Sequence, residues 1–121
     1  MARVLLVDDD PVILRLLEIN FRLEGFETSS ALRGEVALEA ADLDPPDAVV
    51  LDVMLPDLDG HEVYRRLRAR PGLERTPIVF LSARGKDESL PAGATDVVYM
   101  TKPFDPAALV QTVRERIAGA P

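Results

Sequence analysis

The sequence contains no cysteine and only one histidine among its 121 residues. Without cysteine, neither disulfide bonds nor thiolate chemistry is available, and the composition fits a reducing cytoplasm. The N-terminal apolar run, residues 4–7, is too short for a signal peptide or a membrane span. Lysine and arginine number 14 against 21 acidic residues, and the net charge of −7 argues against nucleic acid or an anionic membrane as a direct partner.

What is present describes an ordinary globular protein. Apolar residues make up 47% of the chain and charged residues 29%, as is typical of folded domains. A chain of this length is long enough to bury one hydrophobic core. Repeats, linkers and low-complexity runs are missing from the sequence. We therefore expect a single domain over residues 1–121.

Short apolar runs alternate with helical patterns along the chain. Strands are predicted at residues 3–7, 26–30, 77–81 and 97–100, and in a central run that ends at Asp52. Helices are predicted from Pro11 to a stop at Gly25, over 34–41, over 61–69 and from Pro106 onwards. Alternation of this kind predicts an α/β fold with a parallel sheet and helices on both faces. Five strands and about five helices fit the flavodoxin-like, doubly wound order 2-1-3-4-5.

The helix boundaries carry recognisable signals. Asp10 before Pro11 and Asp105 before Pro106 place a capping carboxylate ahead of a proline at the first helical position. The first helix carries a broad set of apolar residues, namely Ile13, Leu14, Leu16, Leu17, Phe21 and Leu23. His61, near the start of the third helix, is interpreted as a surface residue and not as a ligand.

Acidic residues follow two of the predicted strands. Asp8 and Asp9 close the first strand, and Asp52 closes the third. In the expected strand order these ends meet where the order reverses, which is where such sheets bind ligands. Asp52 taken alone could merely mark the polar end of a strand. Three converging carboxylates repel one another, however, and a hard divalent ion such as Mg²⁺ would resolve that repulsion.

A hydroxyl and an ammonium join these acids. Ser82 ends the fourth strand and Lys102 follows the fifth. Acids, a hydroxyl and a lysine around one crevice suit phosphoryl transfer onto a carboxylate, with Asp52 as the nucleophile and Ser82 and Lys102 holding phosphoryl oxygens. Lys102 could also be a solvated loop charge. Lys86 is the only other lysine in this arginine-rich set of basic residues, so a compact point charge at Lys102 weakly supports the phosphoryl-binding interpretation.

With these residues in place, the sequence resembles the receiver domain of two-component response regulators, and is similar to the chemotaxis regulator. The matching segments run in family order and near family spacing from Val7 to Phe104: Val7-Asp8-Asp9-Asp10-Pro11, Leu51-Asp52-Val53-Met54-Leu55-Pro56, Asp59-Gly60, Leu81-Ser82-Ala83-Arg84 and Thr101-Lys102-Pro103-Phe104. Each segment alone would be weak, and together they are highly specific.

The resemblance implies that Asp52 accepts a phosphoryl group from a sensor histidine kinase or a phosphotransfer protein. It implies Mg²⁺ ligands in Asp9, Asp52 and the Met54 backbone carbonyl, with Asp8 acting chiefly through water. Ser82 and Tyr99 would form a switch pair, in which Tyr99 moves inward when Ser82 turns towards the phosphoryl group. Without the resemblance, Tyr99 reads as a half-buried strand aromatic. A cis peptide before Pro103 is also implied.

One region departs from the family pattern. Between Ser82 and Gly93 the chain is a few residues short of the family's fourth helix, and residues 86–93 offer one strong apolar residue and an internal proline. Such a segment is too weak for a stable amphipathic helix, so we expect it to be shortened or irregular. We also expect residues 84–95 to change order on phosphorylation. The output partner, or an attached output domain, stays open.

Three functions compete. The first is a phosphorylation-dependent signalling switch, with at most slow self-phosphorylation and self-dephosphorylation and no enzymatic role. The second is a Mg²⁺-dependent phosphohydrolase that forms an aspartyl phosphate; such enzymes usually carry a second acid two residues after the nucleophile, where this chain has Met54. The third is a receiver-like interaction module that no longer accepts phosphate.

Overall fold

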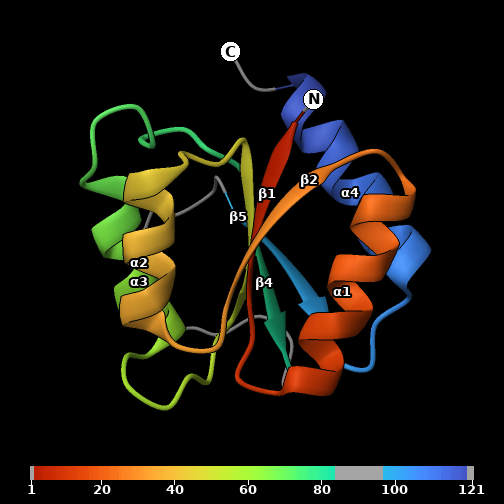
Figure 1. Ribbon diagram of the computed structural model, residues 1–121, viewed down its shortest axis with the longest axis horizontal. Coiled ribbons are helices and arrows are strands. Elements are labelled where there is room, and N and C mark those ends of the chain that lie inside the picture. Colours follow the sequence, from red (N-terminus) through yellow and green to blue (C-terminus); the bar gives the residue numbers. More distant parts are fainter. Residues whose placement is uncertain (1, 84–96, 120–121) are drawn as a thin grey trace.

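The computed structural model describes residues 2–83 and 97–119. Within them, five strands alternate with four helices (Figure 1). The strands are β1 (Arg3–Val7), β2 (Glu27–Ala31), β3 (Ala48–Asp52), β4 (Ile78–Ser82) and β5 (Val97–Thr101). The helices are α1 (Pro11–Leu23), α2 (Gly34–Leu43), α3 (Gly60–Arg68) and α4 (Pro106–Gly119). The predicted elements are thus confirmed, with boundaries that differ by one or two residues.

The sheet is wholly parallel and has the strand order β2-β1-β3-β4-β5. This is the doubly wound order expected from the sequence. The order reverses between β1 and β3, so the carboxyl ends of these two strands border a crevice that no connection covers. The segment expected to hold a shortened fourth helix, residues 84–96, lies outside the described residues, as does the expected order change at 84–95.

The helices form two layers, one on each face of the sheet (Figure 1). Helices α2 and α3 bury Ala37, Leu38, Val63 and Leu67 against one face. Helices α1 and α4 bury their own apolar side chains against the other, namely Leu14, Leu17, Phe21, Leu109, Val110 and Val113. β3 and β4 are buried along their whole length, as expected for central strands covered on both sides.

The helix starts are capped as the sequence predicts. The Asp10 carboxylate accepts a hydrogen bond of 2.9 Å from the backbone N–H of Val12, and Asp105 accepts one of 3.1 Å from Ala107. Gly25 ends α1 with a φ of 91°, a left-handed conformation that suits glycine.

The apolar face of α1 is narrower than predicted. Leu14, Leu17 and Phe21 are buried, whereas Leu16 and Leu23 are exposed together with Val12 and Ile19. The sheet contacts only one side of the helix, so apolar residues on its other side stay in solvent. The apolar set given from the sequence included Leu16 and Leu23 but not Val12 or Ile19.

Candidate functional site

Three carboxylates meet at the carboxyl end of β1 and β3. Asp8 follows β1 and is fully buried, Asp52 ends β3 and is 6% exposed, and Asp9 is exposed. One oxygen of each carboxylate lies within 4.8 Å of the others. The structure therefore brings together the acids that the sequence singled out.

Lys102 completes this cluster from β5. Its Nζ lies 3.0 Å from an oxygen of Asp8 and 3.2 Å from an oxygen of Asp52. The backbone N–H of Lys102 donates to the carbonyl of Ser82 over 2.9 Å. The peptide between Lys102 and Pro103 is cis, as the resemblance implies. Lys102 is a member of the site and not a solvated loop charge.

The charges in this cluster shift the pKa values of its members. Burial raises the pKa of Asp52 above its usual value, and the negative charge of Asp8 adds to the rise. The hydrogen bond from the Met54 N–H and the attraction of Lys102 act in the other direction without cancelling it. For Lys102, burial lowers the pKa, but the hydrogen bond to Asp8 and the charges of Asp52 and Asp8 outweigh it and raise the pKa.

The loop after β3 is tied to the strand end. The Met54 N–H donates to Asp52 over 3.1 Å, and the Gly60 N–H donates to the Val53 carbonyl over 2.8 Å. A Cβ at Gly60 would lie 2.4 Å from the Asp52 carbonyl oxygen and 2.8 Å from the Val53 Cα. Only glycine allows this approach, so the start of α3 is held directly against the carboxyl end of β3.

Ser82 and Tyr99 lie on the neighbouring strands. Ser82 is the last residue of β4 and is 6% exposed, which places it at the same end of the sheet as Asp52. Tyr99 lies in the middle of β5, partly buried, with its ring stacked on Phe80 at 5.2 Å between ring centroids. Tyr99 is thus a partly buried strand aromatic, and its role as a switch residue stays a prediction.

His61 was misjudged from the sequence. It is buried, with 2% exposure, and its ring meets the ring of Phe80 edge-on at 5.2 Å. The Tyr99 hydroxyl lies 3.4 Å from His61 Nε2. The available signal was its helical spacing of three residues from Tyr64, which is buried, because residues three apart share a face of a helix.

The residues present fit a hard divalent cation. The donors are all oxygens, they lie close enough to share one ion, and Asp52 is held in surroundings that disfavour its own negative charge. Hard cations such as Mg²⁺ take oxygen ligands of this kind. Met54, whose carbonyl was predicted as a ligand, lies in the loop two residues after Asp52 with its side chain exposed.

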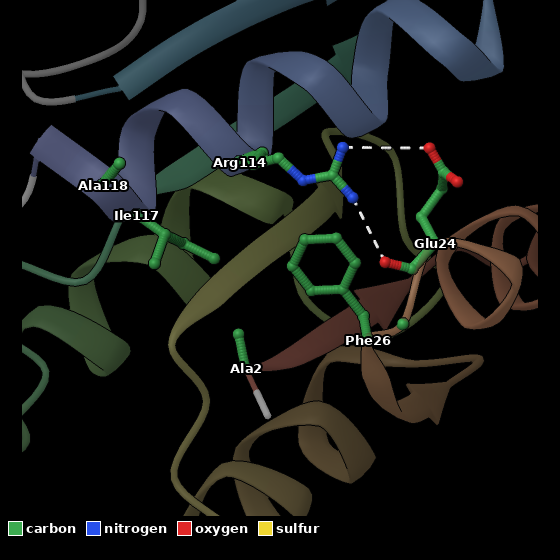
Figure 2. Close-up of a pocket in the computed structure, with 7 residues that line it drawn as sticks. Ala2, Glu24, Phe26, Arg114, Ile117 and Ala118 are labelled. Atoms are coloured by element: carbon green, nitrogen blue, oxygen red, sulfur yellow. Dashed lines mark hydrogen bonds and ion pairs between the residues drawn. The ribbon is translucent and has the colours of Figure 1, made fainter.

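A second hollow lies away from the acids. It has a volume of about 350 Å³ and is lined by residues at the amino end of β1, at the start of β2 and on α4 (Figure 2). Arg114 lies over the Phe26 ring at 5.5 Å and donates to the Glu24 carbonyl over 3.1 Å. β1 separates this hollow from Asp8, so it takes no part in the acidic site.

Fold and site together define a doubly wound α/β protein with an acidic, lysine-bridged site at the reversal of strand order. Comparison with known families agrees: the model of the response regulator receiver domain matches residues 4–114. The chain belongs to this family, and it is a receiver domain of two-component response regulators. Receiver domains of this family act as signalling switches.

Relatives with this domain are longer. The chain is 45% identical over 108 residues to the transcriptional regulatory protein KdpE of Mycobacterium tuberculosis, covering 86% of this chain and 46% of that protein. It is 38% identical over 124 residues to the phosphate regulon transcriptional regulatory protein PhoB of Rhizobium meliloti, covering 99% and 54%. The chain therefore spans about half the length of these relatives.

Solved structures agree with the fold. A putative response regulator from Chloroflexus aurantiacus superimposes with a TM-score of 0.85 at 36% identity, over 97% of this chain and 98% of that one. The BeF3-activated DrrB receiver domain gives a TM-score of 0.80 at 34% identity, over 98% of both chains. Among the described residues, no helix is both long and apolar enough to cross a membrane.

Proposed function

We propose that Asp52 accepts a phosphoryl group from a sensor histidine kinase or a phosphotransfer protein, in a reaction that needs Mg²⁺. The observation that carries the proposal is the Lys102 ammonium, which bridges Asp8 and Asp52 inside a cluster of three carboxylates. A cluster built only to stabilise the fold gains nothing from a third neighbouring carboxylate, whereas phosphoryl transfer needs anionic metal ligands and a cation together.

In the proposed reaction, an oxygen of Asp52 attacks the phosphorus atom. The bond between phosphorus and the imidazole nitrogen of the donor breaks, and its electron pair stays on that nitrogen. Asp9, Asp52 and the Met54 carbonyl would hold Mg²⁺, with Asp8 acting chiefly through water. When bound, Mg²⁺ offsets the negative charge that gathers on the phosphoryl oxygens. Ser82 and Lys102 hold those oxygens after transfer.

The raised pKa of Asp52 bears on this chemistry. A carboxylate must be ionised to act as a nucleophile, and its surroundings disfavour that form because Asp52 is buried beside Asp8. A bound divalent cation reverses the balance by favouring the ionised carboxylate. A metal held by these residues would therefore also favour the form of Asp52 that acts as the nucleophile.

The other two functions fit less well. A phosphohydrolase of the type considered above lacks its second acid, because the position holds Met54 with an exposed side chain. A module that no longer accepts phosphate would have no use for the lysine bridge between Asp8 and Asp52. The single-domain organisation over residues 1–121 and the cytoplasmic location stay predictions.

The exposed side of α1 suits the phosphodonor. Val12, Leu16, Ile19 and Leu23 are exposed at spacings of four, three and four residues, the spacing of a seam against another helix. The stripe begins two residues after the Asp10 cap, and Asp10 follows the acidic pair directly. A donor helix packed along this stripe would end beside Asp52, so we assign the stripe to docking of the kinase or phosphotransfer protein.

The phosphoacceptor is tested with acetyl phosphate and Mg²⁺. Intact-mass measurement should show one phosphoryl group on the wild type and none on Asp52→Asn. The control is Asp44→Asn, an exposed carboxylate outside the cluster, which should behave as the wild type. A phosphoryl group retained on Asp52→Asn would contradict the assignment.

The metal ligands are tested by titration with Mg²⁺. Asp9→Ala should abolish both metal binding and phosphorylation, because it removes the most accessible carboxylate of the cluster. Undiminished Mg²⁺ affinity in this variant would show that the metal lies elsewhere.

The docking stripe is tested by comparing two donors. Ile19→Glu should slow transfer from an autophosphorylated sensor histidine kinase about tenfold, the equivalent of roughly 1.4 kcal/mol of lost contact, and leave acetyl phosphate labelling unchanged. Leu43→Glu is the control, since Leu43 is an exposed apolar residue at the end of α2 on the other face, with 81% exposure against 43% for Ile19. Equal kinase transfer in all three proteins would exclude α1 as the docking surface.

A further inference from the structure

His61 is a buried polar residue in otherwise apolar surroundings. It lies in the first turn of α3, and its ring packs edge-on against Phe80. Phe80 in turn stacks on Tyr99. A buried imidazole needs partners for its polar atoms, so the groups beside its two nitrogens define what it does.

The two nitrogens of His61 face different groups. Nδ1 lies 3.5 Å from the Asp59 carboxylate, which also accepts the backbone N–H of His61 over 2.6 Å. Nε2 lies 3.4 Å from the Tyr99 hydroxyl. The carboxylate favours the proton on Nδ1, because the partner of one ring nitrogen decides which nitrogen is protonated. Nε2 is then an acceptor for the O–H of Tyr99.

The position of His61 is fixed from the phosphoacceptor strand. Its chain neighbour Gly60 donates to the carbonyl of Val53 and leaves no room for a Cβ against the backbone of Asp52. The backbone that follows Asp52 therefore determines where the His61 ring lies. A continuous series of contacts runs from Asp52 through Gly60 and His61 to Tyr99.

We propose that His61 is a positioning residue for Tyr99, and that it links the Asp52 end of β3 to β5 by a route separate from Ser82. The inference rests on the proposed function, in which Tyr99 is the residue that moves on phosphorylation. In it, the hydrogen bond from Tyr99 holds the ring over Phe80, and displacement of the β3–α3 loop on phosphorylation changes that bond. The alternative is that His61 only fills space beside Phe80.

Two substitutions at His61 separate these roles. His61→Phe keeps a ring against Phe80 and removes both nitrogens, whereas His61→Gln loses the ring and keeps a polar group at the reach of Nε2. If His61 positions Tyr99, the response of Tyr99 should be lost in His61→Phe and retained in His61→Gln. If His61 only fills space, the response should be retained in His61→Phe and lost in His61→Gln.

The readout is fluorine NMR of protein labelled with 3-fluorotyrosine. The chain has two tyrosines, and Tyr64→Phe assigns the Tyr99 signal. Beryllofluoride with Mg²⁺ serves as the phosphoryl analogue. The Tyr99 shift that it induces in the wild type should persist in His61→Gln. In His61→Phe, before beryllofluoride is added, the ratio of the outward to the inward position of Tyr99 should change about fivefold, as expected for one lost hydrogen bond. A wild-type ratio and shift in His61→Phe would overturn the inference.

A second measurement needs no substitution at His61. The chain has one histidine, so the imidazole ¹⁵N signals are assigned directly, and Tyr99→Phe removes a single oxygen. The Nε2 signal should move between the wild type and Tyr99→Phe, and an unchanged signal would overturn the inference. Acetyl phosphate labelling of the same proteins separates the two hypotheses. If all variants are labelled equally and the Tyr99 signal is unaltered, only the role of His61 is rejected. If the wild type itself is not labelled, the proposed function is rejected and this inference with it.

Discussion

The two faces of the sheet are packed with different kinds of side chain. On the α1 and α4 face, the buried contacts are aliphatic apart from the rings of Phe21 and Phe26, which meet edge-on at 5.4 Å. On the α2 and α3 face, the core includes Tyr64 and Phe80, and His61 and Tyr99 place polar atoms beside them. Both faces bury large side chains, but the second also places the Tyr99 hydroxyl and the His61 imidazole within its aromatic packing.

This difference separates stability from signalling. Apolar packing is non-directional and favours one close-packed arrangement. A hydroxyl and an imidazole have directional bonds that can be made in one arrangement and broken in another, which is the requirement for a two-state element. We therefore expect the α1 and α4 face to be the fixed layer, while the other face changes on phosphorylation.

The largest effect is expected on the fixed face. Phe21 is fully buried between α1 and the sheet, and Phe21→Ala should lower the free energy of unfolding by about 3–5 kcal/mol. Tyr99→Phe on the other face should change it by less than about 1.5 kcal/mol, because volume is conserved, yet alter the signalling response. Urea unfolding measures both. A larger loss of unfolding free energy in Tyr99→Phe than in Phe21→Ala would contradict the proposed difference between the two faces of the sheet.

Two glycines on the second face give the next effect. Gly60→Ala sets a methyl group against the backbone of Asp52 and Val53, which cannot yield, and should cost at least about 1–3 kcal/mol. Gly34→Ala would meet Val63 Cγ2 and Leu58 Cβ at 2.8 and 2.9 Å, and neither atom belongs to the backbone of a sheet strand. Gly34→Ala should therefore cost less and leave acetyl phosphate labelling intact, whereas Gly60→Ala should impair it. Equal labelling rates would show that the approach at Gly60 is not needed.

Asp57 should have a smaller and pH-dependent effect. Its carboxylate accepts the backbone N–H groups of Gly34 and Glu35 over 2.8 and 2.9 Å, and so caps α2, whose own cap residue Arg33 makes no side-chain bond. These bonds, chiefly the one from Glu35, lower the pKa of Asp57 to about 2. Asp57→Ala should cost roughly 1 kcal/mol, as for other helix caps.

The sign of the pH dependence follows from the lowered pKa of Asp57. The ionised Asp57 carboxylate contributes its full stabilisation of the fold above the pKa of the unfolded chain, about 4. This stabilisation is lost as the pH falls towards the pKa in the folded protein, about 2. Unfolding measured from pH 6 to pH 2 should show the wild type and Asp57→Ala converging at the acid end. Asp44→Ala, without such bonds, should stay parallel to the wild type. A constant gap for Asp57→Ala would rule out the capping role.

The smallest effect concerns Asp52 without metal. Because its pKa is raised, the folded protein holds a proton more tightly than the unfolded chain, and stability falls as pH rises through the folded pKa. Asp52→Asn removes that charge and should unfold at a slightly higher temperature than the wild type at neutral pH with a chelator present. Added Mg²⁺ should narrow the difference. A lower unfolding temperature for Asp52→Asn would mean that the Lys102 attraction outweighs burial.

The sequence predicted the strands and the acidic site well, because both depend on short apolar runs and the residues that end them. It could not predict the capping of α2 by Asp57, since that contact joins residues 23 positions apart. It misjudged His61 because a polar residue in a helix start is usually exposed, and here Tyr99 comes from a distant strand to meet it. Leu16 and Leu23 were grouped with the apolar residues of the first helix, yet they are exposed, because an apolar residue need not be buried.

The bridge made by Lys102 has a consequence for how ions enter the site. Three carboxylates and one ammonium leave a formal charge of −2, which one divalent cation balances and one monovalent cation does not. A cation that takes an oxygen of Asp52, and reaches Asp8 through water, would compete with an ammonium already in contact with both carboxylates. Its observed affinity would therefore include the cost of displacing that ammonium. Lys102→Ala should consequently bind Mg²⁺ more tightly than the wild type while holding a phosphoryl group less well. An ammonium displaced in this way would face the crevice with its charge unmatched, and a phosphoryl group would supply the anion that it had lost.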